Sequence, residues 1–251
     1  YFYTSVCSGY FSVYYSYDGL TWSEPEQHKI EPGQLYYWHG LPADTSTYYS
    51  LKARYVTVVA ETQYLRFLEM GFFETADSAA VIPVADVRCG KEGENCGCRL
   101  FDEQSFVPTR PSYMNSMYFD EIYHARTAYE SLHGLSIYEW THPPLGKDIM
   151  SWCVSLMGMT PFAWRFAGTL AGVLMLPGMY FLGLLMFKKR SWATILCSLM
   201  ALDGMHFVQT RIATIDSFGV LFIIWMFLFM YWYYSISFYD KPLWKTFIPL
   251  G

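Results

Sequence analysis

Short apolar and β-branched runs, without a helical period, occupy the first 75 residues of the chain. Residues 11–16 and 54–59 carry aromatic and β-branched side chains, and such runs favour strands. Residues 64–73 predict a further strand. The Tyr-Asp-Gly-Leu sequence at 17–20 predicts a turn, because Asp-Gly suits backbone positions with φ > 0. The pattern predicts an all-β domain over residues 1–75.

Long apolar runs fill the second half of the chain and have the length of membrane spans. Residues 164–187 run uncharged after Arg165 and are about as long as a bilayer core requires. Two further runs follow, 192–208, interrupted by Asp203 and His206, and 213–239, broken only by Asp216. Residues 148–160 are apolar but too short to cross, which predicts a helix lying in the membrane interface. The predicted fold class is therefore mixed, with an all-β domain followed by an all-α polytopic membrane region over residues 118–251.

A polar segment joins the predicted β domain to the predicted membrane region. Residues 76–117 are small, charged and Gly-rich, with Pro108 and Pro111, which predicts a linker leading back to the membrane. The chain begins at Tyr1 rather than methionine, shows no signal peptide and ends at Gly251 after an aromatic run. We expect both ends to be truncated, with a preceding span or signal placing Tyr1 outside the cytoplasm.

A basic cluster predicts the orientation of the spans. Residues 188–190 are Lys-Lys-Arg and directly follow the uncharged run that ends at Phe187. Such clusters mark the cytoplasmic side, so this span is predicted to run from outside to inside, with residues 1–163 extracytoplasmic. The resulting multi-pass topology in the cell membrane brings six polar side chains to the outer face: Asp120, Glu121, His142, Arg165, Arg211 and Asp216.

The composition agrees with a membrane protein. Hydrophobic residues make up 53% of the chain and charged residues 16%, against about 25% charged in soluble proteins. The aromatic share is 20%, and aromatic side chains gather where a chain meets the membrane interface. The formal net charge of −5 does not suggest binding to nucleic acid, so we expect no nucleic-acid partner.

Five of the six cysteines, all except Cys7, divide into two groups. Cys153 and Cys197 lie in apolar segments and are interpreted as core residues. Cys89, Cys96 and Cys98 are close together in a polar stretch, where either a zinc site or a disulfide would explain them. A fourth zinc ligand is not evident, and an oxidising compartment favours the disulfide, whose pairing stays open.

Two adjacent acids, Asp120 and Glu121, open a predicted helix, with His124 and Arg126 in its next turn. Neighbouring side chains point in different directions around a helix, so one acid can face a reacting hydroxyl while the other holds a substrate. The alternative is that both acids only favour the helix N-terminus, where the dipole stabilises negative charge.

The sequence His-Pro-Pro-Leu-Gly-Lys at 142–147 predicts a rigid loop beside the membrane. Its two prolines fix the backbone and remove two hydrogen-bond donors, and Gly146 allows close approach. His142 and Lys147 would then stand at fixed positions. The alternative is a simple entry turn with a lysine that reaches the interface.

Charged side chains at the ends of spans are costly and are usually functional. Arg165 begins one span and Arg211 ends another, and the planar guanidinium suits phosphate. Either arginine could instead anchor the interface, and Arg211 could pair with Asp216. Asp203, with His206 nearby, lies deeper and could join helices through polar contacts.

Acids, arginines and a histidine on one membrane face suit a reaction between a phosphate-bearing lipid and an outside acceptor. Residues 119–121 (Phe-Asp-Glu), 142–147, Arg165 and 209–217 resemble the protein O-mannosyltransferase family. The resemblance covers roughly residues 110–251. It implies an integral-membrane glycosyltransferase of the GT-C fold, which transfers mannose with inversion from a polyprenyl- or dolichyl-phosphate donor to Ser or Thr hydroxyls of an acceptor protein.

The resemblance also implies roles for individual residues. Asp120 would be the general base or orient the acceptor hydroxyl, and Glu121 would bind acceptor or donor. Arg165 and Arg211 would bind the lipid phosphate, while His142 and Lys147 would shape the nearby loop. Because phosphate is already a good leaving group, no cofactor is required, although a divalent metal at the carboxylates stays open. Asp216 and Asp203 are further candidates.

The first 75 residues resemble a second family, the discoidin or coagulation-factor type C domain. The Ser-x-Asp-Gly-x-x-Trp sequence within 11–22 and the runs at 53–56 and 65–69 carry this resemblance. It implies a β-sandwich that binds carbohydrate or lipid, or one that serves as a spacer. A sandwich before the Asp-Glu pair departs from the mannosyltransferase pattern and leaves the acceptor open. The alternatives are a transferase with a non-protein acceptor, a transporter, or an anchored binding protein.

Overall fold

A computed structural model describes residues 1–5, 7–31, 34–41, 53–62, 65–75, 78, 80–88 and 99–236 of the chain. The chain forms two compact units, Tyr1–Tyr118 and Phe119–Gly251. The predicted disulfide or zinc cysteines, Cys89, Cys96 and Cys98, lie outside the described residues, as do the last three residues of the predicted span 213–239.

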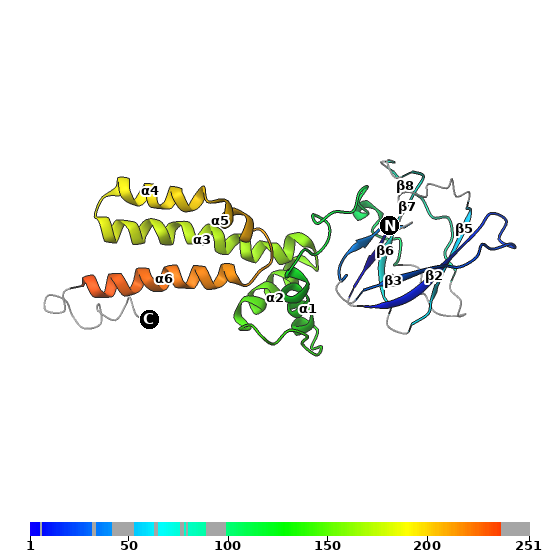
Figure 1. Ribbon diagram of the computed structural model, residues 1–251, viewed down its shortest axis with the longest axis horizontal. Helices are drawn as coiled ribbons and strands as arrows, with labels where there is room; N and C mark the ends of the chain where they lie inside the picture. Colours follow the sequence, from blue (N-terminus) through cyan, green and yellow to red (C-terminus); the bar gives the residue numbers. More distant parts are fainter. Residues whose placement is uncertain are drawn as a thin grey trace. The chain divides into compact units, whose positions relative to one another are not determined.

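The first unit contains two three-stranded antiparallel sheets and a two-stranded one (Figure 1). The predicted strand at 11–16 is confirmed by β2, and the one at 54–59 by β5. The sequence 64–73, predicted as one strand, holds two short ones. The sheet orders are β4-β1-β6, β3-β2-β5 and β7-β8, with β1 at Phe2–Thr4, β2 at Gly9–Ser16, β3 at Glu26–Ile30, β4 at Trp38–His39, β5 at Tyr55–Ala60, β6 at Phe67–Met70, β7 at Phe72–Phe73 and β8 at Val81–Ile82.

Apolar side chains from both three-stranded sheets meet in one core. Phe2 and Met70 come from one sheet, and Phe11, Val13 and Ile30 come from the other. The Phe2 and Phe11 rings lie edge to face with centroids 5.2 Å apart, a favourable aromatic geometry. The two sheets therefore pack face to face. The predicted turn after β2 is also present, with Gly19 at φ +77°.

The stretch expected as a linker, 76–117, belongs in its described parts to the first unit. Strand β8 pairs with β7, and the Met70 N–H donates to the Leu100 carbonyl at 2.9 Å. The Trp38 N–H donates to Ser116 Oγ at 3.0 Å. Backbone groups of the sheets thus find partners in a segment without regular periodicity, which is why the sequence pattern suggested only a linker.

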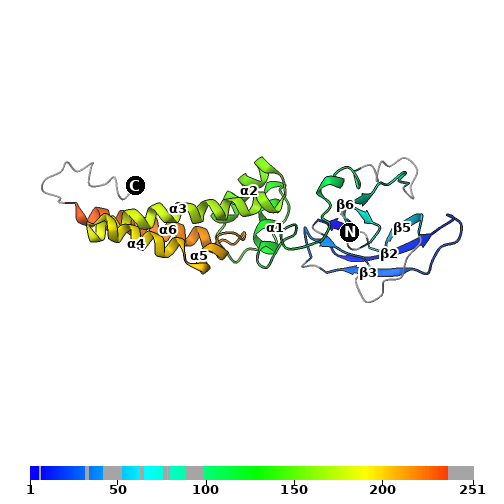
Figure 2. The same cartoon turned by 90° about the horizontal axis from the view of Figure 1, so that it is seen from above.

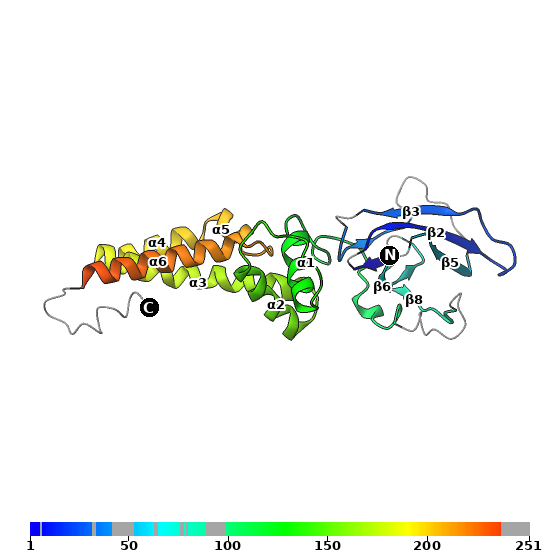
Figure 3. The same cartoon turned by 90° about the horizontal axis from the view of Figure 1, so that it is seen from below.

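The second unit is helical in its described part. Helices α4 and α6 run along α3, and α2 packs against both α1 and α3 (Figures 2 and 3). Pro161 starts α3 at a position that needs no N–H, and Thr160 Oγ1 accepts the Ala163 N–H at 3.3 Å. The helices are α1 at Glu121–Leu132, α2 at Leu145–Met157, α3 at Pro161–Phe187, α4 at Arg190–Ala201, α5 at Gly204–Gln209 and α6 at Asp216–Ser235.

Two of these helices, α3 and α6, are long and apolar enough to cross a membrane. Only 28% of the most apolar window of each is buried, whereas a core helix of a soluble protein would be mostly buried. Apolar side chains therefore cover their outward surface, as lipid requires. These features indicate a membrane protein with helices near the predicted runs 164–187 and 213–239.

The predicted run 192–208 is not one continuous helix. Helix α4 ends at Ala201, and the six-residue helix α5 begins at Gly204. Asp203 lies between them with extended backbone, and its Oδ2 accepts the His206 N–H at 2.8 Å. The aspartate caps α5 and so favours a break, an effect that the apolar pattern of the run does not reveal.

Small residues on α3 let the segment after α5 approach closely. A Cβ on Gly172 would lie 2.6 Å from the Thr210 side chain, and one on Gly168 would lie 3.2 Å from the Ile212 carbonyl oxygen. Such a spacing of small residues is typical of tightly packed membrane helices. Close packing brings residues 210–213 next to the start of α3, where Arg165 lies.

Candidate active site

Glu121, the first residue of α1, joins three segments of the second unit. Its carboxylate is fully buried and accepts two hydrogen bonds from Arg165, from Nε to Oε1 and from Nη2 to Oε2, both at 2.7 Å. Oε1 also accepts the Ala213 N–H at 2.9 Å. This bidentate geometry is the strong form of a charge-assisted contact. The structure thus pairs two predicted site residues with each other.

Asp120 occupies a different environment although it is the preceding residue. It is half-buried at the N-cap position of α1, and its side chain caps no backbone N–H there. The residue before it, Phe119, has φ +51° and is 65% exposed. Positive φ at a bulky residue is strained, and such strain gathers at functional sites. The two adjacent acids therefore occupy different environments: Glu121 is engaged internally, and Asp120 is half-buried.

The predicted loop 142–147 ends at Pro144, because α2 begins at Leu145, and Lys147 in the first turn of α2 closes it. Its side chain is buried, and Nζ donates to the Glu139 carboxylate, to the Glu139 carbonyl at 2.9 Å and to the His142 carbonyl at 3.4 Å. The same carboxylate accepts the Thr141 N–H at 2.6 Å. A Cβ on Gly146 would lie 3.0 Å from the Phe218 ring, so this glycine does permit close approach to α6.

Glu139 is a site residue that the sequence reasoning did not identify. Burial alone would raise the pKa of its carboxyl, but hydrogen bonds from Lys147, Thr141 and His142 hold the pKa well below its usual range. Glu139 is therefore ionised at neutral pH. The sequence held one signal for Glu139. Lys147 stands at the start of an apolar run, and a lysine that is buried there needs a nearby anion.

Arg126 and Glu130 attach the same loop to α1. Arg126 Nε donates to Glu130 Oε1 at 2.6 Å, and the Tyr138 N–H donates to Glu130 Oε2 at 2.8 Å. The Arg126 guanidinium also lies 4.0 Å from the centre of the Tyr138 ring. The loop that carries Glu139 is therefore fixed at both ends.

Arg211 differs from Arg165. It is exposed, and its guanidinium lies 3.7 Å from the centre of the Phe207 ring. Among the described residues it has no acidic partner within salt-bridge distance, and Asp216 does not pair with it. Arg211 therefore keeps a positive charge available to an external anion.

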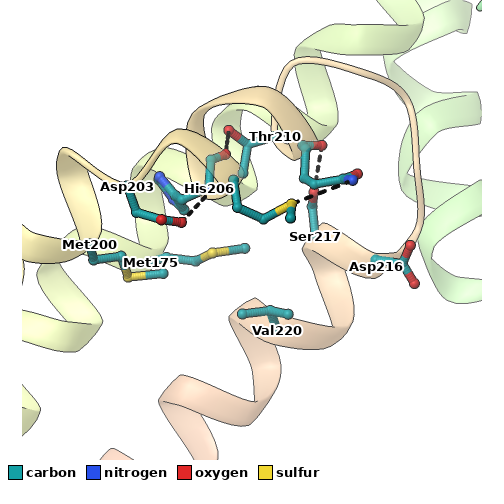
Figure 4. Close-up of a pocket in the computed structure, with 10 residues that line it drawn as sticks. Met175, Met200, Asp203, His206, Thr210, Asp216, Ser217 and Val220 are labelled. Carbon is teal, nitrogen blue, oxygen red and sulfur yellow. Dashed lines mark hydrogen bonds between the residues drawn. The ribbon is translucent and has the colours of Figure 1, made fainter.

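A pocket of about 370 Å³ lies between α3, α4, α5 and α6 (Figure 4). Its walls combine methionines with polar groups, and Asp203 and Asp216 lie on opposite sides. The His206 ring Nε2 lies 3.2 Å from the Gly172 carbonyl oxygen, and Ser217 Oγ donates to the Gln209 carbonyl at 3.2 Å. His206 thus links α5 to α3, as predicted for it, whereas the Asp203 side chain caps its own helix α5 and does not bear out the predicted contact between helices.

The structure brings the predicted residues together in separate groups. Glu121 and Arg165 form one contact, with Asp120 beside them in sequence. His142 and Lys147 share Glu139, and a third side chain, His124, lies near that carboxylate. His124, Glu139 and His142 offer ligand atoms that all lie within 4.8 Å of one another, a set that could hold a metal ion. The carboxylate of Glu121 is not part of that set.

Curated relatives of this chain share a single description. A polyprenol-phosphate-mannose–protein mannosyltransferase of Mycobacterium tuberculosis is 28% identical over 134 residues, which cover 52% of this chain and 23% of the relative. The protein of the same description from Mycolicibacterium smegmatis is 28% identical over 118 residues, 45% of this chain and 23% of that protein. The match thus spans about a quarter of the relatives' length. No family model and no solved structure matches the chain.

Proposed function

We propose that this chain is part of a membrane glycosyltransferase that moves mannose from a polyprenyl-phosphate donor to Ser or Thr hydroxyls of proteins. The arrangement of the two acids carries the proposal. Glu121 is buried against Arg165 and the Ala213 N–H, whereas the adjacent Asp120 is only half-buried. The names of the distant relatives and the two apolar helices support the same reading.

Asp120 is the proposed general base. The acceptor hydroxyl oxygen attacks the anomeric carbon of the donor while its proton passes to the Asp120 carboxylate. The bond between that carbon and the phosphate oxygen breaks, and the lipid phosphate leaves with the electron pair. One displacement inverts the anomeric centre, and a positioned carboxylate contributes typically about 10²–10⁴-fold to such a step.

Arg211 is the proposed ligand of the departing phosphate. It is exposed and lies two residues before Ala213, whose N–H is bound by Glu121. A guanidinium beside the leaving phosphate would stabilise the charge that develops there. Arg165, expected to share this role, is engaged with Glu121 in the structure, so its proposed role is to position Glu121 and the segment that carries Arg211.

The remaining expected residues receive supporting roles in the proposal. Lys147 and His142 hold the loop around Glu139, which lies beyond the acid pair in sequence. Asp203 caps α5, and Asp216 is exposed at the first turn of α6, where it is the reserve candidate for the base. The displacement itself requires no metal.

The proposed orientation puts residues 1–163 outside the cytoplasm and Lys189 inside. The basic residues directly after the apolar helix α3 support it. In a cysteine-free background, a membrane-impermeant thiol reagent should label a cysteine at Leu135, which is 51% exposed, and miss one at Lys189. The reverse labelling pattern would exclude an outward-facing Asp120.

The first unit is proposed to bind carbohydrate, as its discoidin-like sequence implies. The turn between β2 and β3 exposes 71% of Tyr17, 86% of Leu20 and 43% of Trp22, and aromatic side chains of this kind can stack on sugars. Mannose-coated and uncoated resins would test this, with a Trp22→Ala variant as the matched comparison. Equal retention of both proteins on both resins argues for a spacer.

The direct experiment is transfer of labelled mannose from a polyprenyl-phosphate donor to a Ser/Thr peptide by the full chain in nanodiscs. The proposal expects labelled peptide with the original sequence and its loss with Asp120→Asn. Label on a lipid or glycan acceptor would instead support a transferase with a non-protein acceptor. Movement of intact labelled donor across the bilayer would support a transporter.

A further inference from the structure

We propose that His124, Glu139 and His142 form a binding site for a divalent transition-metal ion, with Zn²⁺ as the best match. The set joins helix α1 to the loop before α2, and its ligand atoms all lie within 4.8 Å of one another. Two imidazoles and one carboxylate are a ligand set that zinc uses in proteins, with a further position for water. This inference does not rest on the proposed function.

The main observation is an unpartnered nitrogen. His124 is 4% exposed, and its Nδ1 is buried without a hydrogen-bond partner among the described residues. The nearest acidic atom, Glu139 Oε2, is 4.0 Å away, too far for a hydrogen bond. A buried polar atom without a partner is costly, and a metal ion between the two atoms would satisfy it.

The distances between the ligand atoms suit a metal after small shifts, one of them a lengthening and the other a shortening. Zinc bonds of about 2.0–2.1 Å place tetrahedral ligand atoms about 3.4 Å apart. Glu139 Oε1 and His142 Nδ1 are 3.1 Å apart, and Glu139 Oε2 and His124 Nδ1 are 4.0 Å apart. The His124 and His142 rings lie nearly perpendicular, with centroids 5.2 Å apart. His142 is about half exposed, which leaves an entry path and room for water.

The charges around the set both favour and oppose a cation. His124 Nδ1 has no hydrogen-bond partner among the described residues, so this nitrogen is available to a metal ion. Glu139 supplies a carboxylate inside the set, and Asp120 precedes His124 by about one helical turn. Lys147 opposes a second cation. Of the about four acceptor positions of a carboxylate, Glu139 uses three for Lys147 Nζ and for the N–H and hydroxyl of Thr141, so a metal would take the position that now faces His142 Nδ1.

Bound metal would clamp the Glu139 loop onto α1 within one turn of Asp120. His124 is fixed on the helix, and the two prolines after His142 together with Lys147 fix the loop. The ligands therefore come from rigid supports, which favours binding. The proposed role of the ion is to hold this loop in place.

The test uses the full chain, purified without a polyhistidine tag, stripped with chelator and loaded with Zn²⁺ or Co²⁺. Metal content and calorimetric affinity are compared for the original sequence, His124→Ala, Glu139→Gln and the control His133→Ala. His133 directly follows α1, is exposed and lies outside the cluster. We expect about one ion per chain, with affinity at least about tenfold lower in the first two variants and unchanged in the control.

Cobalt absorption separates this site from a cysteine site and needs no variant. A nitrogen and oxygen ligand set gives visible d–d bands without the near-ultraviolet band of a thiolate. That spectrum supports the proposal, whereas a thiolate band assigns the metal to cysteines and overturns it. The absence of retained metal, or equal retention by all four proteins, also overturns it.

Discussion

Arg165 Nε and Nη2 donate two hydrogen bonds, both 2.7 Å long, to the two carboxylate oxygens of Glu121. The residues are 44 positions apart, and Glu121 is fully buried. Removing one partner of such a pair leaves an uncompensated buried charge, which costs more than the pair contributes when intact. We therefore expect substitutions at Glu121 or Arg165 to lower the stability of the fold, in addition to any effect on sugar transfer.

We expect Glu121→Gln and Arg165→Met each to lower the free energy of unfolding by about 3–5 kcal/mol. The double variant Glu121→Leu with Arg165→Leu should regain part of this loss, because no isolated charge remains. Thermal unfolding in detergent would measure both effects. Single variants with the melting temperature of the original sequence would show that the pair does not stabilise the fold.

Asp120→Asn should leave the melting temperature unchanged and lower sugar transfer about 10²–10⁴-fold at saturating donor. The amide keeps the size of the side chain but cannot take the hydroxyl proton, and Asp120 caps no helix N–H whose loss would destabilise α1. Initial rates with a Ser/Thr peptide measure this. Near-normal turnover in a folded variant would shift the role of base to Asp216.

Arg211→Gln should raise the donor KM roughly tenfold or more, because a hydrogen bond to a charged group is worth about 1.5–3 kcal/mol. The exposed guanidinium has no acidic partner among the described residues, so stability should change little. Lys189→Gln, at the other end of α3, is the matched control. An equal rise in KM for both variants would point to a general charge effect rather than a phosphate contact.

The contact of Glu139 with Lys147 should make stability depend on acidity. The pKa of Glu139 is lowered in the folded chain from an ordinary value of 4.5, so its stabilising contribution is complete above about pH 4.5 and declines as the pH falls toward the folded pKa. The difference in melting temperature between the original sequence and Glu139→Gln should therefore shrink on acidification. A difference that is constant from about pH 3 to pH 7 would contradict the ion pair.

Gly172→Ala should destabilise the second unit by about 1–3 kcal/mol, because its Cβ would lie 2.6 Å from the Thr210 side chain. Gly219→Ala in α6 is the matched control, since no atom lies within 4 Å of its Cβ position. The control should be neutral or slightly stabilising, as alanine favours helices. Similar melting temperatures for the two variants would argue against tight packing of residues 210–213 on α3.

Local pattern determined much of the fold. Alternation and β-branched content predicted β2 and β5, and uncharged length predicted helices near α3 and α6. Strands and long apolar helices depend on each side chain and its neighbours in sequence, so they can be predicted from one sequence. The sequence also predicted that the side chains of Asp120 and Glu121 point in different directions, because adjacent residues at a helix start face different sides.

Tertiary structure alone decided which charges meet. Glu121 reaches Arg165 and the Ala213 N–H, which is 92 positions away, only because Gly168 and Gly172 let the chain after α5 lie against α3. The same holds for Glu139, whose carboxylate receives Lys147 and lies near His124 once the loop has folded back on α1. Partners of this kind depend on how the helices cross and on which backbone N–H groups need an acceptor. The local hydrophobic pattern of a sequence predicts neither of these.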